Sequence, residues 1–143
     1  MKPLLVILAA GASERLGQCK ALVDLGGQTP LERLARAGSA CDGGLVVTGA
    51  DHIAIAPRIP TGLTVVENRD WRAGRTGSVA AAAREAPGRD LLVTPVDTPL
   101  VPKEVFEALL LAWSRAGSPK SCVSASRSAA APRLSWDSRG QAT

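Results

Sequence analysis

The chain has 143 residues, of which 45% are hydrophobic and only 3% aromatic, and its formal net charge is +4. This length fits one main domain with an aliphatic, alanine-rich core. No stretch approaches the ~20 consecutive apolar residues of a membrane span, and the apolar run at the N-terminus is shorter than that of a typical signal peptide. We therefore expect a soluble, cytoplasmic protein without a membrane partner.

Strand and helix patterns alternate along the chain, which predicts an α/β fold built on a mostly parallel sheet. Apolar runs predict buried strands, and the segment TPLE at 29–32 has the capping-box pattern with proline at the first helical position. In chain order we expect a strand at 4–8, a helix from 29 to about 38, a strand at 45–48, a short helical turn at 51–57, a strand at 63–67, a helix at 78–86, a strand at 91–96 and a helix from 103 to about 116.

The segment LAAGASERLGQCK, at 8–20, follows the first predicted strand directly. Gly11 and Gly17 allow a tight turn whose N–H groups face an anion, while Arg15 and Lys20 neutralise its charge, so the loop suits a polyphosphate. The segment has neither the G-x-G-x-x-G spacing of a dinucleotide-binding loop nor the G-K-[ST] ending of a P-loop.

Two further motifs follow later predicted strands. In NRDWRAGRTGS, at 68–78, Gly77 would permit close approach of a ligand, and Ser78 would open a helix whose dipole favours negative charge. A surface loop in which Ser78 or Thr76 merely caps the helix is the alternative. In LLVTPVDTP, at 91–99, Asp97 ends an apolar strand, where a carboxylate is costly unless solvated, paired or metal-bound. A turn or helix-capping aspartate is the alternative there.

Together these three segments resemble the molybdopterin nucleotidyltransferases, enzymes with the glycosyltransferase-A-like, Rossmann-like fold, and the two alanines of LAAG resemble their cytidylyltransferase branch. The resemblance implies a three-layer sandwich around the sheet and transfer of a nucleoside monophosphate, CMP rather than GMP, from a triphosphate to a phosphorylated acceptor such as molybdopterin. It implies a bound CTP or GTP, Mg²⁺, and a molybdoenzyme or its chaperone as partner.

The implied site residues combine the three motifs. The resemblance implies that Arg15, Lys20 and Asp97 are the catalytic residues and that Asp97 is the metal ligand. The residues implied to bind the nucleotide are Leu8, Ala9, Ala10, Gly11, Ala12, Gly17, Gly77 and Ser78.

The last part of the chain differs from the rest in composition. Residues 1–113 hold equal numbers of acidic and basic residues, so the basic excess lies in the last thirty residues, and 118–143 hold seven serines. We therefore expect a nucleotide-binding domain at 1–117 and an irregular, Ser/Arg-rich tail at 118–143. With so few aromatics in a neutral body, nucleic acid is an improbable partner.

The tail departs from the family, because no glycine–histidine pair follows Trp113 and Asp137 lacks the context of a second metal ligand. A C-terminally truncated or frame-shifted member and a natural short form with a flexible tail both stay open. So do a sugar-phosphate or polyol-phosphate nucleotidyltransferase, a catalytically impaired nucleotide-binding remnant, and a protein recruited to nucleic acid by its tail.

The cysteines and the single histidine favour no other chemistry. Cys19, Cys41 and Cys122 lie far apart, without the spacing of metal ligands, and are expected to be reduced thiols. Cys19 alone falls inside the proposed phosphate loop. One histidine, His52, excludes a histidine metal cluster and argues against a serine–histidine hydrolase.

Overall fold

The computed structural model describes residues 2–12, 19–115 and 123–124. Strands and helices alternate through most of this range, as the sequence predicts. The elements are β1 (Leu4–Ala9), η1 (Lys20–Leu22), α1 (Pro30–Ala37), β2 (Gly44–Thr48), α2 (His52–Ile55), η2 (Ala56–Arg58), β3 (Leu63–Glu67), η3 (Trp71–Ala73), α3 (Arg75–Glu85), β4 (Leu91–Pro95), α4 (Lys103–Arg115) and β5 (Val123–Ser124).

All strands belong to one parallel sheet in the order β3-β2-β1-β4-β5. β1 lies at its centre, where Ile7 is in register with Val46 of β2 and with Thr94 of β4. Five of the six β1 residues are buried, because both faces of a parallel sheet are covered. The expected α/β fold with a parallel sheet is confirmed.

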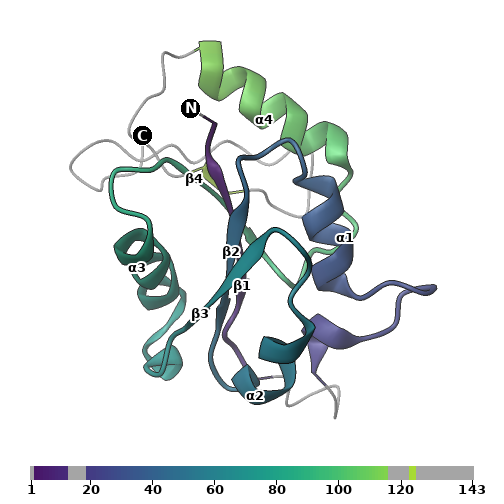
Figure 1. Ribbon diagram of the computed structural model, residues 1–143, viewed down its shortest axis with the longest axis vertical. Helices are drawn as coiled ribbons and strands as arrows, with labels where there is room; N and C mark the ends of the chain where they lie inside the picture. The colour runs from purple at the N-terminus through teal and green to yellow at the C-terminus, as the bar shows by residue number, and fades with distance from the viewer. Residues whose placement is uncertain (1, 13–18, 116–122, 125–143) are drawn as a thin grey trace.

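Helices cover both faces of the sheet and complete a three-layer sandwich (Figure 1). On one face, Leu5 and Ile7 pack with Leu31 and Leu34 of α1 and with Phe106 of α4, all of them at most 1% exposed. On the other face, α3 contributes Ala82 to a second buried cluster, whose other members are Val6, Leu8, Ala10, Leu45, Val47 and Val93. The core is thus aliphatic, as the composition predicts.

Local sequence explains where α1 begins. Thr29 Oγ1 accepts a hydrogen bond from the Glu32 backbone N–H at 3.2 Å, and Glu32 Oε2 accepts one from the Thr29 N–H at 3.4 Å. This is the predicted capping box, which satisfies two otherwise unpaired N–H groups at the start of the helix.

Some expected boundaries are wrong. α3 begins at Arg75 rather than at Ser78, because Gly74, with φ of +116°, is the residue where the chain turns into the helix. Neither Ser78 nor Thr76 caps α3. Asp51 precedes α2 as expected, but its side chain makes no capping hydrogen bond.

The end of the sheet adds an element that the sequence patterns did not indicate. Val123 and Ser124 pair with Leu92 and Val93 of β4 as the short strand β5. The rest of the expected irregular tail lies outside the described residues. Within the described part of the chain, no helix is long and apolar enough to cross a membrane.

Candidate functional site

A cavity of about 440 Å³ opens at the carboxyl ends of β1 and β4. Residues that follow β2 and β3 complete its walls, so four loops from one edge of the sheet meet there. Ligands of open α/β sheets bind at this edge. The lining residues are Leu8, Ala9, Ala10, Gly11, Ala12, Cys19, Lys20, Ala21, Asp51, Ile55, Trp71, Arg72, Gly74, Arg75, Ser78, Pro95, Val96 and Asp97.

The first predicted loop forms one wall of the cavity, since Leu8, Ala9, Ala10, Gly11 and Ala12 all line it. Backbone hydrogen bonds fix the start of this loop: the Val96 N–H donates to the Leu8 carbonyl and the Ala50 N–H to the Ala10 carbonyl, both at 3.0 Å. A Cβ added at Gly11 would meet no atom within 4 Å, so glycine leaves this part of the cavity open. Arg15 and Gly17 lie outside the described residues.

The fold brings Lys20 and Asp97 together from positions 77 residues apart. Lys20 Nζ lies 3.5 Å from Asp97 Oδ1, and the two side chains are 39% and 41% exposed. Thr98 Oγ1 donates to the Pro95 carbonyl at 3.2 Å and so stabilises the turn that carries Asp97. The carboxylate at the strand end is therefore both solvated and paired, which removes the cost of placing it there.

Ser78 also lines the cavity, although it does not open a helix. It is the fourth residue of α3 and only 3% exposed, and its Oγ accepts a hydrogen bond from Asn68 Nδ2 at 3.0 Å. Gly77 is not among the lining residues. Gly74 is, and its positive φ shows that the glycine the loop requires lies three positions earlier than predicted.

Trp71, Arg72 and Arg75, which belong to the segment at 68–78, are also part of the cavity wall. A Cβ at Gly49 would lie 2.6 Å from Trp71 Cβ, so glycine at the end of β2 makes room for the tryptophan. Arg72 Cζ lies 5.1 Å from the centre of the Trp71 ring, within the range of a cation–π contact. The loop thus adds an aromatic surface and two positive charges.

Cys19 and Asp51 both line the cavity, a proximity that spacing in the sequence could not indicate. Burial raises the pKa of the Cys19 thiol, and the nearby negative charge of Asp51 raises it further. Backbone hydrogen bonds from Ala21 and Leu22 oppose this change in pKa. The thiol is protonated at neutral pH and is therefore a poor nucleophile.

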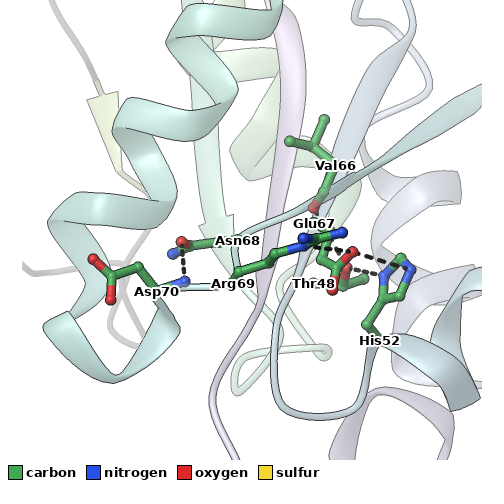
Figure 2. A network of polar contacts seen from close by, with 7 residues as sticks. All are labelled: Thr48, His52, Val66, Glu67, Asn68, Arg69 and Asp70. Carbon is green, nitrogen blue, oxygen red and sulfur yellow. Dashed lines mark hydrogen bonds and ion pairs between the residues drawn. The ribbon is translucent and has the colours of Figure 1, made fainter.

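A polar network anchors α2 and the start of the β3–α3 loop (Figure 2). His52 Nδ1 lies 2.6 Å from Thr48 Oγ1, and His52 Nε2 lies 3.7 Å from Glu67 Oε2. The Asn68 N–H donates to the Thr48 carbonyl at 2.7 Å, and Asn68 Oδ1 accepts from the Asp70 N–H at 3.1 Å. These contacts tie the loops that follow β2 and β3 to each other.

Within the described ranges, no group of three or more His, Cys, Asp and Glu side chains could hold a metal ion. Among the described residues that line the cavity, Asp51 and Asp97 carry carboxylates, and that of Asp97 is 41% exposed. Mg²⁺ is commonly held by one or two carboxylates together with substrate phosphates and water, so Asp97 fits a magnesium ion that arrives with a nucleotide.

Comparison with known proteins agrees with this arrangement. The family model described as MobA-like NTP transferase domain matches residues 5–139. No curated protein sequence matches the chain.

Three of the solved structures that share this fold illustrate the likeness. Rv0371c from Mycobacterium tuberculosis has a TM-score of 0.67 and 25% identity, with 81% of this chain and 62% of that chain covered. A nucleotidyl transferase from Methanothermobacter thermautotroptrophicus has a TM-score of 0.64 and 25% identity, with 77% and 57% covered. The 2-C-methyl-D-erythritol 4-phosphate cytidylyltransferase from Thermus thermophilus has a TM-score of 0.62 and 28% identity, with 86% and 53% covered. The chain thus spans less than two thirds of the length of each.

Proposed function

The chain belongs to the family of MobA-like NTP transferase domains, and on that premise we propose that it transfers a nucleoside monophosphate from a nucleoside triphosphate to a phosphorylated acceptor, with release of pyrophosphate. The proposed donor is CTP in preference to GTP, and the proposed acceptor resembles molybdopterin. The LAAG form of the first loop supports this choice of acceptor and branch, and the likeness to a cytidylyltransferase supports CTP.

One observation carries the proposal: Lys20 and Asp97 meet at 3.5 Å at the mouth of a cavity walled by the loop that follows β1. A lysine can neutralise phosphate oxygens, and a nearby carboxylate can hold the cation that accompanies them. The cavity volume, about 440 Å³, lies within the range of small-molecule sites.

The proposed roles follow from position. The loop at 8–12 and Lys20 would bind the triphosphate, and Arg15 and Gly17 are assigned to it from the sequence motif. Ser78, with Gly77 beside it, would contact the nucleoside from α3, and Arg72 and Arg75 would add positive charge at the same wall.

In the proposed reaction an acceptor phosphate oxygen attacks the α-phosphorus, and pyrophosphate leaves with the electron pair of the broken P–O bond. Phosphoryl-type transfer of this kind depends mainly on positioning and on charge neutralisation. Lys20 would neutralise the phosphates, and the β1 loop would align them. Mg²⁺ held by Asp97 and the phosphates would supply further stabilisation of negative charge.

A polyol phosphate is the second candidate acceptor. It is favoured by the likeness to 2-C-methyl-D-erythritol 4-phosphate cytidylyltransferase, with which the chain shares 28% sequence identity. That protein is about twice as long as the matched region, so its substrate comes to this chain only as a candidate.

A thermal-shift series tests the nucleotide site first. The full chain is heated with CTP, GTP, ATP or UTP, each with and without Mg²⁺. A ligand at about 100 times its Kd stabilises the folded state by about 2.7 kcal/mol. We expect a magnesium-dependent rise of the midpoint that is largest with CTP.

Two variants make this result specific. Lys20→Ala should abolish the rise with CTP, whereas Lys103→Ala, which removes an exposed lysine at the start of α4, should preserve it. No rise from a cooperatively unfolding wild-type chain would contradict the nucleotide site. A rise without pyrophosphate release in the presence of acceptor would indicate the nucleotide-binding remnant instead.

A further inference from the structure

Asn68 directly follows β3 and is a buried polar residue that does not itself line the cavity. Its amide contacts Ser78, which does line the cavity and is only 3% exposed. We propose that Asn68 is a positioning residue, which fixes the Ser78 hydroxyl as a hydrogen-bond donor toward the cavity, so that the site selects a nucleoside that presents an acceptor to α3. The inference rests on the proposed function, because Ser78 is there assigned to the nucleoside.

Two backbone contacts hold Asn68 and determine which way its amide faces. The Asn68 N–H donates to the Thr48 carbonyl at 2.7 Å, directly after the last paired residues of β2 and β3. Asn68 Oδ1 accepts from the Asp70 N–H at 3.1 Å (Figure 2). Because a backbone N–H can only donate, the amide atom that faces Asp70 is the oxygen. The Nδ2 group therefore points the other way, toward Ser78.

The orientation of this amide decides the role of the Ser78 hydroxyl. Asn68 Nδ2 lies 3.0 Å from Ser78 Oγ, and an amide nitrogen offers only hydrogens, so the hydroxyl oxygen accepts. A serine hydroxyl also has one hydrogen of its own to donate. Within the described ranges, the Ser78 side chain makes no second hydrogen bond. Since Ser78 lines the cavity, a bound nucleoside can supply the acceptor for this hydrogen.

A donor of fixed direction discriminates between nucleosides. An acceptor that faces Ser78 completes its hydrogen bonding, whereas a donor there would leave a buried polar group unpaired. On its pairing edge cytosine has two adjacent acceptors, O2 and N3, whereas guanine has two adjacent donors, the N1–H and the N2 amino group. The polarity of the Asn68–Ser78 pair therefore supports CTP rather than GTP as the proposed nucleotide.

A double-mutant cycle that reverses this polarity tests the inference. Asn68→Asp keeps the shape of the side chain and the acceptor for the Asp70 N–H, but its carboxylate accepts the Ser78 hydrogen and draws it away from the cavity. Titration calorimetry with CTP and Mg²⁺ compares the wild type, Asn68→Asp, Ser78→Ala and the double variant. The effect of the new charge on the phosphates is present with or without the hydroxyl, so it cancels in the cycle. We expect a coupling equivalent to a roughly threefold to tenfold change in Kd, the effect of one hydrogen bond.

A ligand without a nucleoside separates positioning from disturbance of the fold. Inorganic tripolyphosphate with Mg²⁺ offers the same phosphates but nothing for Ser78 to bind. Ser78→Ala should therefore weaken CTP binding and leave tripolyphosphate binding unchanged, and Asn68→Asp should weaken CTP binding more than tripolyphosphate binding. Gln28→Glu is the matched control, because it makes the same change from amide to carboxylate at a residue that does not line the cavity. It should leave both Kd values unchanged.

The outcomes distinguish this inference from the proposed function. A cycle without coupling, or equal losses of affinity for CTP and tripolyphosphate, would overturn the role of Asn68 in a chain that still binds CTP. A wild type that binds no triphosphate would overturn the proposed function, and the inference with it. If Asn68→Asp does not unfold cooperatively, Asn68→Ala replaces it in the same cycle. That variant adds no charge and frees the hydroxyl to rotate, so a coupling of up to about threefold in Kd is expected.

Discussion

Replacing Asp97 with asparagine should reduce the effect of magnesium on nucleotide affinity. Asparagine keeps the size of the side chain and one oxygen but removes the negative charge. The carboxylate is 41% exposed and lies 3.5 Å from Lys20 Nζ. Without a metal ion, this charge opposes an incoming triphosphate and attracts the lysine that should bind it. With Mg²⁺, the same charge would hold the cation that accompanies the phosphates.

The size of each effect follows from this geometry. An ion pair this exposed contributes no more than about 1 kcal/mol, so its loss should change folding stability little. Because Lys20 is then released from Asp97, the variant should bind CTP in the absence of Mg²⁺ up to about fivefold more tightly. With Mg²⁺ and acceptor, loss of the metal ligand should remove several kcal/mol of transition-state stabilisation, which is about 10²- to 10³-fold in kcat/KM.

The assay measures CTP affinity with and without Mg²⁺ by calorimetry and pyrophosphate release by a coupled enzyme reaction. Asp42→Asn is the matched control, since Asp42 is also an exposed aspartate and pairs with Arg89 Nη2 at 2.9 Å, but it does not line the cavity. The control should behave as the wild type does in both assays. Equal turnover in Asp97→Asn and wild type would refute the metal-holding role, and weaker binding of CTP alone would refute the electrostatic reasoning.

Three further predictions concern the cavity, the core and pH. Gly11→Val should abolish the CTP-induced thermal shift with little change in the midpoint of the ligand-free chain, because a Cβ there meets no atom within 4 Å. Phe106→Ala should lower the free energy of unfolding in urea by about 3–5 kcal/mol, since the ring is 0% exposed, whereas Leu111→Ala, at 52% exposed, should change it little. Burial raises the pKa of the Cys41 thiol from 9.0 to about 11, so the folded state keeps this proton to higher pH than the unfolded state does. The resulting stability is complete below pH 9 and is lost toward pH 11, and Cys41→Ala should therefore lose less stability over that interval than the wild type.

The sequence predicted those features of the fold that depend on neighbouring residues. The start of α1 follows from Thr29 and Glu32, which satisfy each other's backbone groups within one turn. The predicted start of α3 was wrong because either Gly74 or Gly77 could be the residue where the chain turns into the helix. Only the backbone dihedral angles show that it is Gly74. The two-residue strand β5 has no periodic pattern to detect, and its pairing with β4 is a tertiary event.

At the candidate site, the residues at strand ends and Ser78 could be predicted, whereas other parts of the cavity wall could not. Ala10 and Asp97 follow buried strands, and the carboxyl ends of parallel strands lie at one edge of the sheet. That Cys19 and Asp51 line the same cavity depends instead on how two short turns pack, which no spacing of residues encodes. Trp71 lines the cavity because Gly49, more than twenty residues earlier in the chain, leaves room for it.

The order of the strands explains why Lys20 and Asp97 meet. From β1 the chain proceeds outward through β2 to β3 and then returns, by way of α3, to place β4 on the other side of β1. β1 and β4 are therefore neighbours whose following segments leave in different directions, and an open α/β sheet has its crevice at such a switch point. The segment after β1 contributes the cation Lys20, and the segment after β4 contributes the anion Asp97, so opposite charges face each other across one opening. A carboxylate beside an anion site weakens binding unless a cation arrives with the anion. This juxtaposition is the physical reason to expect that the chain binds a nucleotide together with its metal ion rather than a bare phosphate.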